Sequence, residues 1–212
     1  TYTLGTDPCL KSTTKSIAVT DCLVTAQIRI ALEAAYDAAN NSMRTELIDN
    51  GLLPISQPFN RAPWNYNGTE NVITLADIPT NTVDWVLVEA RSTTTGQAID
   101  QAAGFLLKNG IIVDVDGITN GINFRNLTEN EAYYLVVRTR NHLATMTANA
   151  VTLPNASFYD FTSAATQAYG TMQQIEVEAG VFAQIAGDFD SNGIITVADF
   201  NQYANDLSLI HI

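Results

Sequence analysis

The amino-acid sequence predicts a mostly β protein, an antiparallel β-sandwich of the immunoglobulin-like or jelly-roll-like kind. Apolar and β-branched runs of strand length follow one another from about residue 72. Asn-Gly and Asp-Gly pairs, which favour tight hairpin turns, separate several of these runs. The 212 residues are 46% hydrophobic and 15% charged, enough to bury a core. We also expect a short helix near the N-terminus and a C-terminal loop followed by a helix.

Residues 1–24 are an expected N-terminal segment, rich in Thr and Ser, that contains both cysteines, Cys9 and Cys22. A disulfide between them would stabilise the fold by about 3 kcal/mol through chain entropy. Two buried thiols or a metal pair are the alternatives, but no Cys-x-x-Cys motif and no nearby histidine support them. The start at Thr1, without a charged and apolar leader, is what we expect of a mature or excised segment.

Residues 25–186 are the expected sandwich domain. Residues 27–33 alternate apolar and polar side chains, which favours a strand, while the alanines at 34–39 leave a helix open. Asn41-Ser42 is a helix-start signal for residues 43–48. Residues 54–70 are rich in proline and are expected to form a loop.

From residue 72 onward the sequence predicts one strand after another, with Trp85 packed in the core. Asn109-Gly110, Asp116-Gly117 and Asn120-Gly121 are the expected turns. The expected strands cover residues 83–90, 97–108, 111–115, 133–140 and 144–153, and residues 174–185 are also strand-like.

The third part, residues 187–212, contains the most informative stretch of the chain. Residues 188–199 carry oxygen-bearing side chains at loop positions 1, 3, 5, 9 and 12 and glycine at position 6, the ligand spacing of a calcium-binding EF-hand loop. Calcium takes six to eight oxygen ligands, so a short loop must aim alternate residues inward. Gly193 is expected to take the positive-φ turn. The expected ligands are the side chains of Asp188, Asp190, Asn192, Thr196 and Asp199 and the backbone carbonyl of Ile194.

An acidic turn that binds no metal is the alternative, because Asp, Asn and Gly bend the backbone without an ion. Ile195 at position 8 favours the metal site, whereas Asp199 at position 12 departs from the Glu of EF-hand sensors. A second candidate loop beginning at Asp114 places Arg125 at position 12 and does not fit. The residues after the loop recur at helical spacing and predict a helix with one apolar face, formed by Phe200, Tyr203, Ala204 and Leu207.

The pattern Gly-Asp-x-Asp-x-Asn-Gly-x-Ile-x-x-x-Asp at residues 187–199 resembles one repeat of a dockerin, the calcium-bound module that docks enzymes onto scaffold proteins. Dockerins carry two such repeats, and this chain shows one. Residues 174–185, before the loop, are strand-like and do not read as an entering helix. The resemblance implies a half-motif joined to a β-rich body.

Five other stretches carry a second resemblance through their order in the chain: residues 52–54, 63–70, 83–89, 113–117 and 134–143. They are similar to C-terminal modules of large secreted and surface proteins of Bacteroidota and neighbouring bacteria, often labelled haemagglutinin- or adhesin-like. This resemblance covers roughly residues 26–205. It implies an extracellular β-rich module of an adhesive or structural protein, with no catalytic residues.

Charge and motif content exclude several functions. The net charge of −12 and the isoelectric point near 4.3 disfavour nucleic acid and anionic membranes as partners. No apolar run is long enough to span a membrane. The sequence has no nucleophile elbow, P-loop or zinc-protease motif, and we expect His142 to hydrogen-bond a turn. Acidic residues such as Glu89 would form a hydrolytic pair only by proximity in space.

We therefore expect a non-catalytic, extracellular or cell-surface β-module that Ca²⁺ stabilises and that serves adhesion or surface structure. Its expected partners are other protein modules or identical subunits. One alternative is a subunit of a self-assembling filament, in which residues 10–24 or 207–212 add as a strand to a neighbour's sheet. Another is a dockerin-like docking module that recruits a partner through the helix after the loop.

Overall fold

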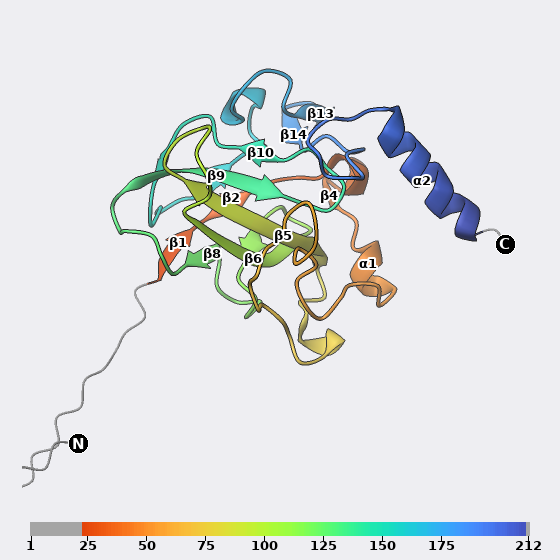
Figure 1. Ribbon diagram of the computed structural model, residues 1–212, viewed down its shortest axis with the longest axis horizontal. Coiled ribbons are helices and arrows are strands. Elements are labelled where there is room, and N and C mark those ends of the chain that lie inside the picture. The colour runs from red at the N-terminus through yellow and green to blue at the C-terminus, as the bar shows by residue number, and fades with distance from the viewer. Residues whose placement is uncertain (1–22, 211–212) are drawn as a thin grey trace, which may run out of the picture.

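A computed structural model describes residues 23–210 of the chain (Figure 1). The protein is mostly β with predominantly antiparallel pairing, which confirms the predicted sandwich-like class. The predicted Cys9–Cys22 disulfide lies outside the described residues, as does most of residues 10–24 and the end of the 207–212 tail.

The main sheet has six strands, ordered β10-β9-β5-β6-β7, with β11 also paired to β9. Its central strand, β5 (Thr82–Arg91), pairs antiparallel with β6 (Asp100–Leu107) and β9 (Ala132–Arg138). A register shift between Thr82 and Asp84 interrupts the β5–β6 ladder. The remaining strands of this sheet are β7 (Ile112–Val113), β10 (Thr145–Met146) and β11 (Val151–Thr152).

Four two-stranded pairs surround the main sheet, and only the pair of β2 with β12 is parallel among the residues described. The pairs are β1 (Val24–Ala26) with β8 (Ile122–Phe124), β2 (Ile28–Arg29) with β12 (Tyr159–Asp160), β3 (Tyr36–Asp37) with β4 (Ser42–Met43), and β13 (Ile175–Glu178) with β14 (Val181–Ala183). The helices are α1 (Glu46–Asp49), α2 (Val197–Ile210) and the short 3-10 helices η1 (Glu33–Ala35), η2 (Leu75–Asp77) and η3 (Ala165–Gln167).

The main sheet buries apolar side chains on both faces, because successive residues of a strand point to opposite sides. In β5, Val86 and Val88 belong to one apolar cluster and Trp85 and Leu87 to the other. Residues of β1, β2, β8 and β14 cover the first cluster. The irregular segment between α1 and β5 covers the second, with Leu53, Phe59, Val72 and Ile78. Trp85 lies in the core as predicted, and its indole Nε1–H donates to the Pro54 carbonyl at 2.8 Å.

The long predicted strands are present in the structure, whereas several short predicted elements differ in length or type. The strands expected at residues 83–90, 97–108 and 133–140 are present as β5, β6 and β9. The expected N-terminal helix is shorter than residues 43–48, because Ser42 and Met43 pair with β3 and α1 begins at Glu46. The strand expected at 27–33 is reduced to β2, and the helical alternative at 34–39 yields only η1.

The C-terminal loop follows β14 and leads into α2, which extends away from the sheet (Figure 1). The helix predicted after the loop is therefore present. Within residues 23–210, none of the helices has the length and apolar character that crossing a membrane requires.

Candidate functional site

Backbone and side-chain hydrogen bonds fix the C-terminal loop to the segment that follows β9. The Leu143 N–H donates to the Ile185 carbonyl at 2.9 Å, and His142 and Ala186 form a single β-bridge. Further along, the Gly187 N–H donates to the Asn141 carbonyl at 3.0 Å. Ser191 Oγ donates to the Arg140 carbonyl, also at 3.0 Å. Residues 185–191 thus dock onto residues 140–143 before the loop turns toward α2.

Three carboxylates of the loop converge. One oxygen from each of Asp188, Asp190 and Asp199 lies within 4.8 Å of the others, so the three could hold a metal ion together. Asp188 is 2% exposed and Asp199 is 1% exposed. Three like charges at this separation repel one another, and a cation among them would remove that cost.

Asp188 has one carboxylate oxygen that is buried without a partner among the described residues. Its Oδ2 accepts the Gly193 N–H at 3.0 Å, whereas its Oδ1 is buried and has no hydrogen-bond partner among the described residues. Gly193 adopts φ +87°, the turn that the sequence predicted for it. A buried carboxylate oxygen without a partner is costly, which is the environment that a bound cation would correct.

Asp199 ties the two ends of the loop together. Its Oδ1 accepts the backbone N–H groups of Phe189 at 2.9 Å and Asp190 at 3.3 Å. Its Oδ2 accepts the Thr196 N–H at 2.8 Å and the Thr196 hydroxyl at 3.2 Å. The Thr196 hydroxyl oxygen in turn accepts the Ala198 N–H at 3.1 Å, so this pair also caps the first turn of α2. Asp199 therefore has a structural role whether or not an ion is bound.

The other expected ligands lie in the same loop and hydrogen-bond within it. The Asn192 backbone N–H donates to Asp190 Oδ1 at 3.0 Å, and Asn192 Nδ2 donates to Asp190 Oδ2 at 2.7 Å. Asn192 Oδ1 accepts the Ile194 N–H at 2.8 Å, and the Ile194 side chain is exposed. These contacts close the turn in which the sequence places positions 3, 5 and 7 of the site.

The pKa values of the two buried carboxyl groups, Asp188 and Asp199, are shifted in opposite directions. Burial raises the pKa of Asp188, and the neighbouring Asp199 and Asp190 charges act the same way, against the hydrogen bond from Gly193. The backbone hydrogen bond from Thr196 leads the interactions that lower the pKa of Asp199. The donor set consists of oxygen atoms, which suits a hard divalent cation and not a thiolate- or imidazole-bound metal.

Packing beyond the loop joins it to α2. The rings of Phe189 and Tyr203 lie 5.3 Å apart between centroids. On the outer side of the loop and helix, Ile194, Val197 and Phe200 are exposed by 64%, 73% and 64%. The loop and helix thus present an apolar surface to solvent.

His142 and Glu89, two ionisable residues of the sheet region, are both buried. His142 is 4% exposed, and neither ring nitrogen has a hydrogen-bond partner among the described residues, so the prediction that its side chain bonds a turn is wrong. Burial lowers the pKa of His142 to about 4. Glu89 accepts Arg138 Nε at 2.6 Å and also pairs with Arg91. That carboxylate stabilises the sheet through two ion pairs.

Sequence reasoning missed the anchors of the loop, Ser191 and the 140–143 segment. Ser191 occupies position 4, which contributes no ligand in the motif, and Arg140 lies 51 residues away. Comparison with known proteins adds no family: no family model matches the chain, and no curated protein and no solved structure shows significant similarity to it.

Proposed function

We propose that this protein is a non-catalytic, extracellular β-module whose C-terminal loop binds Ca²⁺, and that it serves adhesion or surface structure. The unpartnered, buried Oδ1 of Asp188 among three converging carboxylates is the observation that carries the calcium site. The ligand spacing and the resemblance to surface modules of Bacteroidota support the calcium identity and the extracellular setting.

Bound calcium would secure the junction between the sheet and α2. The loop is hydrogen-bonded to Arg140 and Asn141 on one side and continues into the first turn of α2 on the other. An ion that neutralises Asp188, Asp190 and Asp199 would hold both sides in one geometry. Extracellular modules bind calcium with Kd of about 10⁻⁴–10⁻³ M, which suffices where calcium is millimolar.

Calorimetric titration of chelator-treated protein with CaCl₂ tests this proposal. We expect about one equivalent of Ca²⁺ to bind, with Mg²⁺ much weaker. At a calcium concentration of 100 times Kd, linkage stabilises the protein by about 2.7 kcal/mol, so the melting temperature should rise by about 5–10 °C.

Asp188→Asn is the informative variant, because the amide keeps the size of the side chain but removes its charge. We expect it to weaken calcium binding at least about tenfold. Glu129→Gln is the matched control, because it removes the same charge from an exposed residue that lies far along the chain from the loop. Equal calcium affinity in wild type and Asp188→Asn would reduce residues 188–199 to an acidic turn.

A dockerin-like docking role is the second candidate, and the exposed Ile194, Val197 and Phe200 favour it. This role requires calcium-dependent binding of a cohesin-type module, measured by calorimetry with and without chelator. Phe200→Ala should abolish that heat while leaving the calcium titration unchanged. Heat that is absent in both conditions would reject the docking role and leave the calcium site untouched.

A further inference from the structure

A cavity of about 490 Å³ lies beside the segment onto which the calcium loop docks. It falls within the size range of small-molecule sites in proteins. Five parts of the chain form its wall: the region around η1, the start of α1, the segment between α1 and β5 at Arg61, the beginning of β5 and the segment after β9. Its lining includes the polar residues Arg61, Asp84 and Arg140 and the apolar residues Leu32, Leu47 and Val83.

The lining concentrates positive charge in an acidic protein. The chain has ten Lys and Arg residues and a net charge of −12, yet Arg44, Arg61 and Arg140 all line this one cavity. Two carboxylates, Glu46 and Asp84, accompany them. Since burial lowers the pKa of the neighbouring His142 to about 4, that ring is neutral near pH 7. The cavity therefore favours an anion over a cation.

Arg140 is held rigidly and still has donors to offer. Its Nε donates to Asp84 Oδ2 at 3.1 Å and its Nη2 donates to Asp84 Oδ1 at 2.7 Å. Asp84 is 6% exposed, and burial raises its pKa while the charge and hydrogen bonds of Arg140 oppose that rise. A guanidinium has five N–H donors, so the Nη1 edge of Arg140 is left for a ligand. The Arg140 side chain remains 27% exposed.

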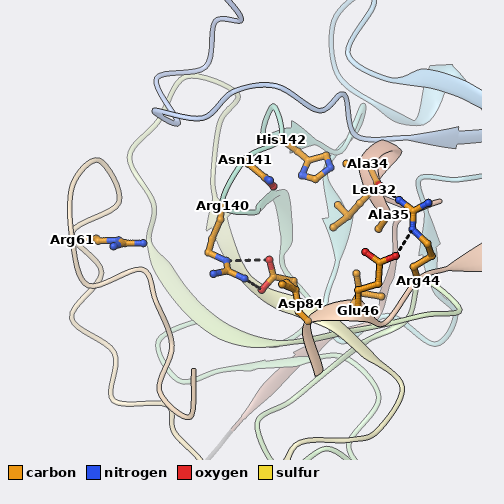
Figure 2. Close-up of a pocket in the computed structure, with 12 residues that line it drawn as sticks. Leu32, Ala34, Ala35, Arg44, Glu46, Arg61, Asp84, Arg140, Asn141 and His142 are labelled. Carbon is orange, nitrogen blue, oxygen red and sulfur yellow. Dashed lines mark hydrogen bonds and ion pairs between the residues drawn. The ribbon is translucent and has the colours of Figure 1, made fainter. Parts of the chain in front are cut away.

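Arg61 faces this edge from the opposite wall. Figure 2 shows its side chain extending across the cavity toward Arg140 and Asp84. The Arg61 guanidinium makes no hydrogen bond or ion pair with any described residue, unlike that of Arg44, which donates to the Ala34 carbonyl at 2.6 Å. The loop that carries Arg61 is anchored on either side, because Phe59 is fully buried and its ring meets Trp64 edge-on at 5.2 Å. A free guanidinium is thus presented from a fixed loop.

The remaining lining restricts the body of the ligand. Leu32, Leu47 and Val83 provide apolar surface, together with Ala34 and Ala35. Among the described residues that line the cavity, none is Phe, Tyr or Trp, so a sugar ring lacks the usual stacking platform. A short aliphatic body fits this lining better than a pyranose.

We propose that this cavity binds a small organic carboxylate with a short aliphatic body, its carboxylate lying between Arg61 and the free edge of Arg140. Two guanidinium groups on one carboxylate supply charge-assisted, bidentate hydrogen bonds. The apolar wall accommodates the aliphatic part. The same chemistry is offered by a free short-chain acid and by the C-terminal residue of a peptide.

Side-chain Nε–H NMR spectra of the full chain in calcium-containing buffer, titrated with sodium butyrate, test the proposal. We expect the Arg61 and Arg140 signals to shift with a common Kd on the order of 1 mM. Butyramide, the uncharged isostere, should bind at least about tenfold more weakly. N-acetylleucine distinguishes the sources: tighter binding than butyrate indicates a peptide end, and weaker binding a free acid.

Arg61→Gln should weaken butyrate binding at least about tenfold, and its exposed loop position makes misfolding a small concern. Lys108→Gln is the matched control, because Lys108 is also exposed and cationic but does not line this cavity. Equal losses in the two variants would mean that net charge alone attracts the anion and would overturn the proposal. So would equal affinity for butyramide, or tighter binding of glucuronate than of butyrate.

Discussion

His142 makes the stability of this protein depend on pH in a window that the structure defines. The pKa of an exposed histidine is 6.5, and burial lowers that of His142 to about 4 in the folded protein. The folded state therefore binds fewer protons than the unfolded state between these pH values. The contribution of His142 to the free energy of unfolding is fully present above about pH 6.5 and is lost as the pH falls toward 4. The full shift corresponds to about 3 kcal/mol at 1.36 kcal/mol per pKa unit.

About 2 kcal/mol of that loss should occur between pH 7.5 and pH 5, before most carboxylates titrate. His142→Leu removes the titrating ring and leaves no buried nitrogen without a partner, so we expect it to be at least as stable as wild type at pH 5. Urea unfolding at both pH values, at constant calcium, measures the free energy of unfolding of each protein. His211→Gln is the control. If wild type and His142→Leu lose the same free energy between the two pH values, the buried neutral histidine does not control the dependence.

Three further predictions follow from other contacts. Arg138→Met leaves the buried Glu89 with Arg91 as its remaining cation. It should lower the free energy of unfolding, measured by urea melts, by about 2–3 kcal/mol. The double variant Glu89→Gln/Arg138→Met should regain part of that lost free energy. Gly193→Ala places a side chain at φ +87° with open space around it, so it should cost about 1 kcal/mol and weaken calcium binding about fivefold by calorimetry. Gly180→Ala, at φ +77° in the β13–β14 turn and equally open, should leave calcium affinity unchanged; a loss there too would mean that strain acts globally. Chelation of calcium should weaken butyrate binding several-fold in the NMR titration, since site couplings of 1–3 kcal/mol are typical, and unchanged affinity would show the two sites to be independent.

The long central strands could be predicted because their sequence reports their burial on both faces. Six of the eight residues at 83–90 are apolar, and β5 is covered by one apolar cluster on each side. The shorter elements depend on distant partners. Ile28 and Ile30 are fully buried, in keeping with the alternation in the sequence, but β2 pairs with β12, about 130 residues away. No local pattern contains that pairing, so the length of β2 was not predictable.

The candidate metal loop is local, which is why its spacing could be recognised. Asp188, Asp190 and Asp199 converge because a short loop and one helical turn determine their separation. The anchoring of the loop is not local: Ser191 bonds the Arg140 carbonyl, and that contact requires β9 and the C-terminal segment to be adjacent. The same holds for the cavity, whose arginines at 44, 61 and 140 come from three separate parts of the chain.

These two kinds of site meet in residues 140–143. Arg140 offers its side chain to the cavity and its carbonyl to Ser191 of the loop, while Asn141 accepts the Gly187 N–H. The backbone position of Arg140 therefore depends on the loop, whereas the orientation of the Arg140 guanidinium depends on Asp84. A cation that orders the loop would restrict the Arg140 backbone before any carboxylate arrives. By reciprocity, a carboxylate that fixes Arg140 would raise the affinity of the loop for calcium by the same factor. The arrangement would couple cation binding at the loop to carboxylate binding at a cavity that three arginines line.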